Sequence, residues 1–367
     1  MQCVRLLHCA DVHLDTSFVG LGEAVARRRR AAIRRTFQRV IDLALEKEVD
    51  ALTIGGDLYE DLRSQRDTAQ FLQQEFDRVS CPVLIAPGNH DYWHPGSLYA
   101  TESWPPNVTI FNSPQFVPLE IAGWRIFGAA HVQPKGTKDL LRSLLVEPGG
   151  LPAIGLFHGS ERGQLLVQEE GKQDHCPFVE PEILGSGLKY ALLGHFHTPR
   201  STSLLVYPGN PEPLTFGETG QRGAVLVDFS VMPPAVQVLD VATFSLTETR
   251  VDVTGCFHSE ALLDRISMAM LKGKDTGTRV HLEGELSPGV RVTRTEILEI
   301  LRQGGACVDV VFDCRPALDL EALRQAPDAR GQFVRALAAR PDFDSELVQA
   351  ALLAGLDALR GEEPVLL

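Results

Sequence analysis

The chain has 367 residues, a mass of 40.2 kDa and 44% hydrophobic residues, so it can bury a large core, and disorder is excluded as its main state. No apolar run approaches the roughly 18 residues of a membrane span, so we expect no membrane segment, no export signal and a cytoplasmic location. Seven cysteines without a CxxC pair indicate reduced thiols, and the net charge of -13 argues against a protein that coats nucleic acid by bulk electrostatics.

Short apolar runs recur through the first 240 residues, and each ends in Gly, Asp, Asn or His. Such runs are typical of strands buried on both faces. The predicted strands span residues 4–9, 51–54, 83–86, 125–129, 153–157, 190–193, 204–207, 224–229 and 236–241. Amphipathic stretches over 23–48 and 67–79 predict helices between the first three strands. This alternation predicts an α/β sheet with right-handed crossovers.

A second pattern begins near residue 242. It predicts strands over 244–253, 279–286 and 307–312 and helices over 259–271 and 294–303, the second with a capping box between Thr293 and Glu296. After Pro316, two further helices are predicted over 331–339 and 345–360. We therefore predict a main domain over 1–242, a small α/β domain over 243–316 and a helical tail over 317–367.

Five of the predicted strands are followed directly by side chains that commonly bind metals. These side chains are Asp11 and His13, Asp57, Asn89 with His90 and Asp91, His158, and His195 with His197. The carboxyl ends of neighbouring strands meet at one edge of a sheet, and residues i and i+2 of an extended segment point the same way. The five segments can therefore converge on one cavity.

The expected ligands comprise two carboxylates, one carboxamide and four imidazoles, from Asp11, Asp57, Asn89, His13, His158, His195 and His197. This mixture suits ions of the manganese, iron or zinc type better than calcium. Seven ligands are too many for one ion, so we expect two divalent ions about 3.5–4 Å apart that share a carboxylate. Manganese is the expected metal, with iron, zinc or nickel as alternatives.

His158 is the ligand with the least sequence support, because it stands alone after its strand. His131 and His175 are alternatives, and His158 is preferred because a short apolar run precedes it and Gly159 follows. The remaining histidines are interpreted as surface or locally bonded groups, namely His8, His94, His258 and His281.

The motifs resemble those of the calcineurin-like metallophosphoesterases, whose pattern is DxH, GDxx, GNH[DE], a lone H and GHxH. Residues 56–59, 88–91 and 207–212 are similar to the DNA repair exonuclease branch, which includes SbcD and the nuclease subunit of the double-strand-break repair complex. The resemblance covers about residues 4–230. It implies a sandwich of mixed sheets flanked by helices, followed by a smaller α/β capping domain and a helical tail.

The resemblance also implies roles for individual residues. Asp11, His13 and His197 would hold the first ion, and Asn89, His158 and His195 the second, with Asp57 as the bridge. The implied reaction is phosphodiester hydrolysis by water that the ions activate, as in a DNA exonuclease. His90 would donate a proton to the leaving oxygen, and Asp91 would orient His90 or cap the following turn. Three basic residues after predicted strands are candidate substrate contacts, namely Lys135, Lys138 and Arg200.

One position departs from the resemblance. Some nucleases of this branch carry a second functional histidine three residues after the bridging aspartate, and this chain has Glu60 there, followed by Asp61. Two added negative charges at the mouth would disfavour a phosphodiester backbone. A phosphoesterase for nucleotides or other small phosphoesters is therefore one alternative. A non-catalytic metal-binding subunit is another, and the intact His90 argues against it.

Three surface patterns bear on partners. The basic residues Arg27–Arg30, Arg34, Arg35 and Arg39 are interpreted as a solvated face partly paired with Glu23, Glu46 and Glu48, with binding of phosphate or of a partner as the alternative. In the similar branch an SMC-like ATPase binds helices after the capping domain. The predicted helix 345–360 could dock on such a partner, or pack on its own domain, through Leu347, Ala351, Ala354 and Ala358. A stripe of Ala69, Leu72, Phe76 and Val79 fits either a homodimer or the core.

Overall fold

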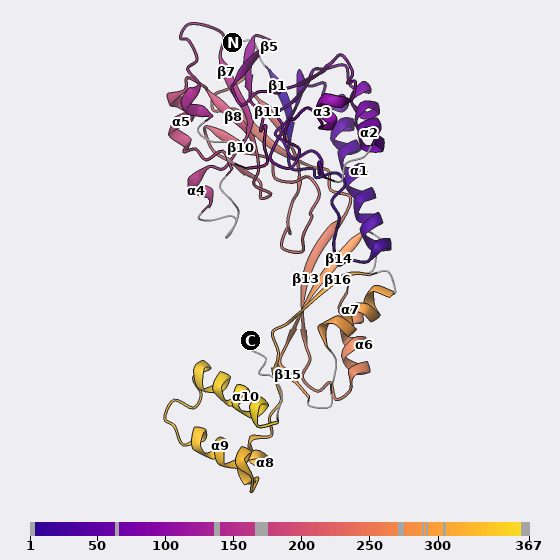
Figure 1. Cartoon of the computed structure of the whole chain (residues 1–367), viewed down its shortest axis with the longest axis vertical. Helices are drawn as coiled ribbons and strands as arrows, with labels where there is room; N and C mark the ends of the chain where they lie inside the picture. The colour runs from indigo at the N-terminus through magenta and orange to yellow at the C-terminus, as the bar shows by residue number, and fades with distance from the viewer. Residues whose placement is uncertain are drawn as a thin grey trace. The chain divides into compact units, whose positions relative to one another are not determined.

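A computed structural model of the chain (Figure 1) describes residues 4–62, 66–135, 140–165, 175–270, 275–287, 290, 293–303 and 306–360. Contacts divide the chain into two units. Unit 1 contains Met1–Thr247, Leu271–Thr278 and Gly305–Cys307, and unit 2 contains Glu248–Met270, Arg279–Gly304 and Val308–Leu367. The domain boundaries expected at residues 242 and 316 stay predictions. Every helix in the described part of the chain is too short or too polar to cross a membrane.

The first sheet of unit 1 has six strands. Their order is β12 (Ala235–Asp240), β11 (Gly223–Asp228), β1 (Arg5–Cys9), β2 (Ala51–Ile54), β3 (Val83–Ile85) and β4 (Val108–Ile110). β1 to β4 run parallel, whereas β11 pairs antiparallel with both β1 and β12. The carboxyl ends of β1, β2 and β3 therefore lie at one edge.

The second sheet also has six strands. Their order is β5 (Val117–Ile121), β6 (Trp124–Gly128), β7 (Ala153–His158), β8 (Tyr190–Gly194), β10 (Leu205–Tyr207) and β9 (Arg200–Ser201). β6, β7, β8 and β10 are parallel, and the outer strands β5 and β9 are antiparallel to their neighbours. The parallel core again places the ends of β7 and β8 side by side.

Alternating side chains of the strands explain why the two sheets stack. Leu6 and Leu84 point into a core shared with Ile154 and Leu192 of the second sheet. Neighbouring residues on the same strands, such as Leu7, point to the opposite face and pack against helices. The result is a four-layer arrangement of helices, two sheets and helices.

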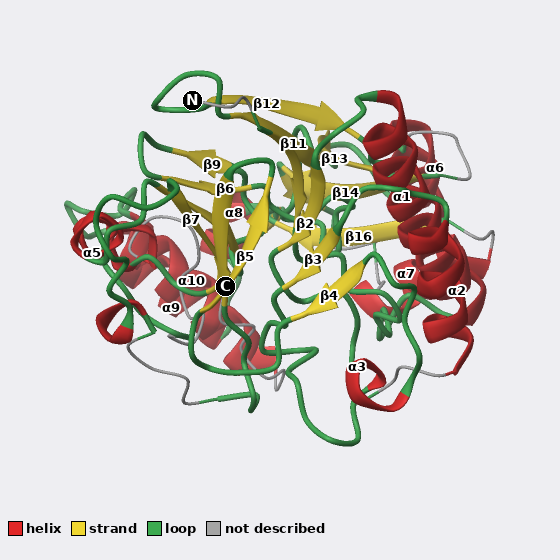
Figure 2. Ribbon diagram, turned by 90° about the horizontal axis from the view of Figure 1, so that it is seen from above, coloured by secondary structure: helices red, strands yellow, loops and turns green. Residues whose placement is uncertain are grey.

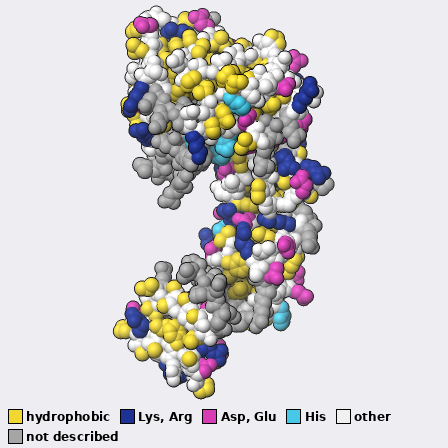
Figure 3. Space-filling view, viewed as in Figure 1, with side chains coloured by type: hydrophobic (Ala, Val, Ile, Leu, Met, Phe, Trp, Pro, Cys, Tyr) yellow, Lys and Arg dark blue, Asp and Glu magenta, His cyan; other side chains and the backbone are white. Residues whose placement is uncertain are grey.

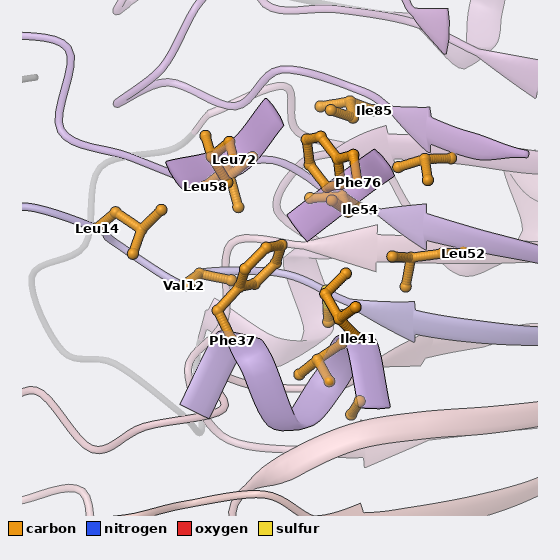
Figure 4. Close-up of a cluster of buried hydrophobic side chains, with 14 of the residues drawn as sticks. Val12, Leu14, Phe37, Ile41, Leu52, Ile54, Leu58, Leu72, Phe76 and Ile85 are labelled. Atoms are coloured by element: carbon orange, nitrogen blue, oxygen red, sulfur yellow. The ribbon is translucent and has the colours of Figure 1, made fainter. Parts of the chain in front are cut away.

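Helices α1 (Glu23–Glu46) and α2 (Arg66–Asp77) cover the outer face of the first sheet, beside β2, β3 and β4 (Figure 2). Figure 4 shows Phe37 and Ile41 of α1 and Phe76 of α2 facing Leu52 and Ile54 of β2. The second sheet is covered by α5 (Glu180–Gly185) and the short helix η1 (Leu141–Ser143). Unit 1 also contains α3 (Leu98–Thr101) and α4 (Arg162–Leu165).

The remaining elements form a small sheet followed by helices. The sheet has the order β13 (Ser245–Asp252), β14 (Thr276–Glu283) and β16 (Cys307–Phe312), with helices α6 (Ser259–Ala269) and α7 (Arg294–Gln303) between the strands. Two short strands, β15 (Glu285–Leu286) and β17 (Arg315–Pro316), pair in parallel. The helices α8 (Leu320–Gln325), α9 (Ala329–Ala338) and α10 (Glu346–Arg360) follow.

The predicted fold class is confirmed: mixed sheets are flanked by helices, and helices end the described chain. The expected capping box is present, since the backbone N–H of Thr293 donates to the Glu296 carboxylate and the N–H of Glu296 donates to the Thr293 hydroxyl. The sequence pattern did not predict β4, β5, β9, β17, α3, α4, α5, α8 or η1. β5 is mostly exposed, so it lacks the continuous apolar pattern of the inner strands.

The structure decides between the alternatives for two apolar stripes. The stripe of Ala69, Leu72, Phe76 and Val79 is buried within unit 1, which agrees with the core and not with a dimer surface. On α10 the packed face consists of Val348, Leu352 and Leu356, not the face expected from the sequence. Leu347, Ala351 and Ala358 of the expected face are exposed, and Ala354 is half-buried.

Candidate metal centre

The loops after β1 and β2 run side by side and continue the pairing of their strands. The backbone N–H of Asp11 donates to the carbonyl of Gly56 at 3.0 Å, and that of His13 donates to the carbonyl of Asp57 at 2.9 Å. Asp11, His13 and Asp57 have positive φ angles of 53°, 51° and 52°, a region that residues with a side chain seldom occupy. Such strain persists where the surrounding structure holds it, and it clusters at functional sites.

The two sheets meet at this site through hydrogen bonds. The carboxylate of Asp11 accepts the backbone N–H of His195 at 3.0 and 3.1 Å. His158, the last residue of β7, donates from Nδ1 to the carbonyl of Gly55 at 2.9 Å. A side chain at Gly56 would place its Cβ 2.7 Å from the Cα of Gly88, so the loops after β2 and β3 can approach only because both residues are glycine.

The structure brings all seven expected ligands together. Single ligand atoms of Asp11, His13 and His197 lie within 4.8 Å of one another, as do those of Asp11, Asp57 and His158. Asn89 and His195 complete the cluster. The Asn89 Oδ1 is 3.0 Å from the His158 Nε2, and the rings of His158 and His195 have centroids 5.2 Å apart.

The donor chemistry of the cluster fits cations. The Nδ1 of His158 donates to a carbonyl, so a neutral His158 would turn the lone pair of its Nε2 toward the Asn89 Oδ1 and toward the Asp57 Oδ2, 3.5 Å away. The Nε2 of His13 is buried and makes no hydrogen bond to any described residue, and it lies 3.8 Å from the same Asp57 oxygen. Lone pairs facing one another in a buried space are the arrangement that a divalent ion resolves.

Electrostatics at Asp57 point the same way. Burial alone would raise the pKa of its carboxyl, but the imidazoles of His158, His90 and His13 hold that pKa far below its usual value. Asp57 is thus a carboxylate at neutral pH, with its Oδ1 accepting the backbone N–H of His90 at 2.8 Å. Its position between the histidines of both groups suits a bridging ligand.

Glu60 occupies a different place from the one expected. Its Oε1 accepts the Nδ1–H of His13 at 2.8 Å, and its Oε2 accepts the Nδ1–H of His90 at 3.0 Å. Burial alone would raise the pKa of Glu60, but these two hydrogen bonds lower it to about 2. Asp61 likewise accepts a hydrogen bond from His94 at 3.0 Å. The interpretation of these two carboxylates as free negative charges at the mouth is therefore corrected.

His90 lies at the open side of the cluster, with 44% of its side chain exposed. Burial would lower the pKa of this imidazole, but the hydrogen bond to Glu60 and the nearby Asp57 raise it to about 9. Its ring packs edge-on against His13, with centroids 4.8 Å apart. The Nε2 of His90 is the nitrogen left for a contact from outside.

Asp91 is fully buried, and its carboxylate accepts four hydrogen bonds. The Oδ1 accepts the backbone N–H groups of Asp57 and Gly88 at 3.0 and 2.6 Å, and the Oδ2 accepts the N–H of Leu58 at 2.8 Å and the hydroxyl of Tyr99 at 2.6 Å. These contacts tie the loop after β2 to the loop after β3. Of the two roles considered for Asp91, the bonds match capping of the turn.

Glu218 is a residue of the site that the sequence motifs did not predict. Its Oε1 accepts the Nδ1–H of His197 at 2.8 Å, and its Oε2 accepts the backbone N–H of Leu214 at 2.7 Å. Burial would raise the pKa of Glu218, but these contacts lower it to about 2. Its signal in the sequence was its place in the loop that carries the motif at residues 207–212.

The alternatives to His158 lie one layer further out. His131 is fully buried and donates from Nε2 to the backbone carbonyl of His158 at 2.9 Å, while the ring of His175 stands 5.4 Å from that of His195. The other histidines contact groups elsewhere. His8 is fully buried and bonds to Thr53 and to the Leu193 carbonyl, so of its two interpretations the locally bonded one holds and the surface one does not.

The expected substrate contacts have less support. Lys135 is exposed. The pKa of His175 is lowered mainly by burial and by His158, and to a smaller extent by Lys135. Arg200 is half-buried in the edge strand β9. Lys138 lies outside the described residues. Several arginines of α1 have partners within unit 1: Arg35 pairs with Asp275 at 2.8 Å, and Arg30 pairs with Glu23 at 3.0 Å, as expected. Arg29 is buried beside Glu212, so the interpretation as a solvated face is wrong for it.

Comparisons with known proteins point to one family. The family described as calcineurin-like phosphoesterase matches residues 4–199. The chain is 28% identical over 326 residues to a Bacillus subtilis protein named uncharacterized metallophosphoesterase YhaO, covering 82% of this chain and 78% of that protein. It is 24% identical over 394 residues to the DNA double-strand break repair protein Mre11 of Methanopyrus kandleri, covering 98% and 84%. A Rhodobacter capsulatus protein, named as one of the subunits of the nuclease SbcCD, is 24% identical over 284 residues, covering 62% and 67%.

Proposed function

The chain belongs to the calcineurin-like phosphoesterase family, and we propose that it is a metal-dependent phosphodiesterase that cleaves DNA, as an exonuclease in DNA repair. The observation that carries this proposal is the convergence of Asp11, His13, Asp57, His158 and His197 in one buried cluster. The relatives named as a DNA repair protein and as part of a nuclease support DNA as the substrate.

We propose two bound divalent ions, held by the seven clustered residues, with manganese as the resident metal. The mixture of imidazole, carboxylate and carboxamide donors supports that choice. When bound, such ions supply charge neutralisation at the phosphoryl group and a nucleophilic water near neutral pH. Asp57 would serve both groups of ligands, since its Oδ2 faces His13 and His158.

His90 is the proposed proton donor for the leaving oxygen. Glu60 holds the Nδ1–H of its ring, so the proton that a protonated His90 can deliver is the one on Nε2. Asp91 keeps the loop that carries Asn89 and His90 against the loop that carries Asp57. Lys135, Lys138 and Arg200 remain proposed contacts to the substrate.

A phosphoesterase for nucleotides or other small phosphoesters is the second candidate. The observation that favours it is the mixed charge of the face drawn in Figure 3, where groups of Lys and Arg side chains lie next to acidic and apolar ones among the described residues. The pairing of α1 arginines within unit 1 agrees with it. DNA would then need contacts beyond bulk electrostatics.

Hydrolysis assays with manganese, zinc, nickel and iron separate these candidates. Single-stranded DNA, duplex DNA and a chromogenic phosphodiester are compared for the wild type, Asp57→Asn and His90→Ala. Cleavage of DNA that both substitutions abolish supports the nuclease. Cleavage of the small diester alone supports the second candidate, no hydrolysis supports a non-catalytic metal-binding subunit, and hydrolysis that survives Asp57→Asn contradicts the site.

We further propose that an SMC-like ATPase binds the exposed face of α10. Leu347 is 80% exposed there, and Ala351 and Ala358 lie on the same side of the helix. Co-purification with such an ATPase from the same source should be lost in Leu347→Asp. It should be kept in the control Gln325→Glu on α8, and equal recovery of both variants would contradict the proposal.

A further inference from the structure

Glu60 connects two imidazoles that have different tasks in the proposed reaction. Each carboxylate oxygen serves one ring, the Oε1 at 2.8 Å from the Nδ1 of His13 and the Oε2 at 3.0 Å from the Nδ1 of His90. The two rings also pack against each other. One side chain is thus shared between an expected metal ligand and the proposed proton donor.

The backbone around Glu60 is held on both sides. Its own N–H donates to the carbonyl of Leu14 at 3.0 Å, and the N–H of Asp61 donates to the carbonyl of His90 at 3.2 Å. The Glu60 side chain is only 24% exposed. The carboxylate is therefore placed by the loops after β1 and β3, and it has little freedom to leave the two rings.

The hydrogen bonds decide which nitrogen of each ring is left over. A carboxylate can only accept, so both rings carry hydrogen on Nδ1. The Nε2 of His13 then points into the buried cluster, 3.8 Å from the Asp57 carboxylate, with no hydrogen bond to a described residue. The Nε2 of His90 belongs to a ring that is 44% exposed. The Nε2 of His13 is therefore available to a metal ion, and the Nε2 of His90 is available to a substrate.

We propose that Glu60 is a positioning residue that couples metal binding to proton delivery, by fixing His13 for an ion and His90 for the leaving oxygen. The proposal rests on the proposed function. This role requires a carboxylate at position 60, where similar nucleases have a histidine. A carboxylate accepts hydrogen bonds from two rings at once, whereas an imidazole has only one acceptor nitrogen. Glu60 thus contributes to the reaction without touching the substrate.

Glu218 provides a matched comparison within the same site. Its carboxylate holds the Nδ1 of His197 at 2.8 Å, as Glu60 holds that of His13, but its other oxygen goes to the backbone of Leu214. Both glutamates are therefore expected to support metal binding. Only Glu60 is expected to affect proton delivery.

The test compares Glu60→Gln with Glu218→Gln. Gln keeps the size of the side chain but removes the negative charge, which weakens the hydrogen bond to any ring that it still holds. At position 60 its single acceptor oxygen also leaves one of the two rings without a partner. Equilibrium dialysis with Mn²⁺ measures metal affinity without any reaction, and each variant should weaken one site about 10–100-fold. If Glu60→Gln is unfolded by circular dichroism, Glu60→Asp takes its place, since it keeps the charge but loses the reach to two rings.

Hydrolysis at saturating Mn²⁺ then separates the two glutamates. Hydrolysis of a 4-nitrophenyl diester releases nitrophenolate, a leaving group that needs no proton. Hydrolysis of a thymidine dinucleotide releases a sugar alkoxide, a leaving group that does need a proton. Glu60→Gln should lose at least about 100-fold more kcat on the dinucleotide than on the nitrophenyl diester, and Glu218→Gln should lose the same factor on both.

Two results would overturn the proposal: an unchanged Mn²⁺ affinity in Glu60→Gln, or equal losses on the two diesters. If the wild type hydrolyses neither diester, the proposed function fails instead. The Mn²⁺ affinity of Glu60→Gln still decides whether Glu60 positions His13.

Discussion

Replacing Asp91 tests whether this residue supports the site or takes part in the reaction. Asp91 is fully buried, and its four hydrogen bonds among the described residues go to groups other than the His90 ring. Its four hydrogen bonds come from the backbone N–H groups of Asp57, Leu58 and Gly88 and from the Tyr99 hydroxyl. We therefore expect its loss to lower stability first, and activity only through the position of the loops.

The size of the effect follows from counting the donors left without an acceptor. In Asp91→Asn, an oxygen at the Oδ1 position keeps both N–H groups bonded there, and the amide can donate to the Tyr99 hydroxyl. One buried N–H, that of Leu58, loses its acceptor, which costs about 1–3 kcal/mol. Burial and the neighbouring Asp57 raise the pKa of Asp91, so losing this charge offsets part of that cost. Asp91→Ala leaves all four donors without an acceptor and should lower the free energy of unfolding by about 4 kcal/mol or more.

Urea unfolding of the metal-free protein, followed by tryptophan fluorescence, measures these differences. The exposed Asp77, the last residue of α2, gives the control Asp77→Asn, which should stay within about 0.5 kcal/mol of the wild type. The Mn²⁺ assays follow on variants that remain folded. Wild-type stability in Asp91→Asn, combined with a lost or displaced pH profile of hydrolysis, would refute the bracing role and show a part in the chemistry.

Three further perturbations should have measurable effects. Burial lowers the pKa of His8 from 6.5 to about 4, so between pH 6.5 and pH 4 only the unfolded chain takes up a proton at this residue. The free energy of unfolding should therefore fall by up to about 3 kcal/mol as the pH drops through this range. His8→Gln should remove this pH dependence in urea unfolding. Gly128→Ala would place a Cβ 2.0 Å from the Phe111 ring and should lower the free energy of unfolding by about 1–3 kcal/mol. The control Gly185→Ala meets no atom within 4 Å and should change that free energy by less than about 1 kcal/mol. Equal melting temperatures of the two variants would contradict this packing. Mn²⁺ at 100 times its Kd should add about 2.7 kcal/mol of stability per site, and a melting temperature unchanged by chelator would argue against the metal centre.

Local patterns in the sequence were sufficient for most of the fold. The inner strand β2 was predicted residue by residue, because a strand buried on both faces needs a continuous apolar run. The edge strand β5 was missed because solvent on one side removes that requirement. On α10 the periodicity indicated a helix but not its buried face, since small apolar residues occur on both sides.

The sequence by itself determined the chemistry available at the site, because metal-type side chains stand directly after strands whose ends must share an edge. Only the tertiary structure decided how those groups are held. Glu60 reaches His13 across 47 positions of the chain, and Glu218 reaches His197 across 21. Asp91 looked like a neighbour of His90 but bonds to the backbone of the loop after β2, 33 and 34 positions away. Hydrogen bonds between separate loops leave no periodic trace in the sequence, because they depend on where strands end in space rather than on spacing along the chain.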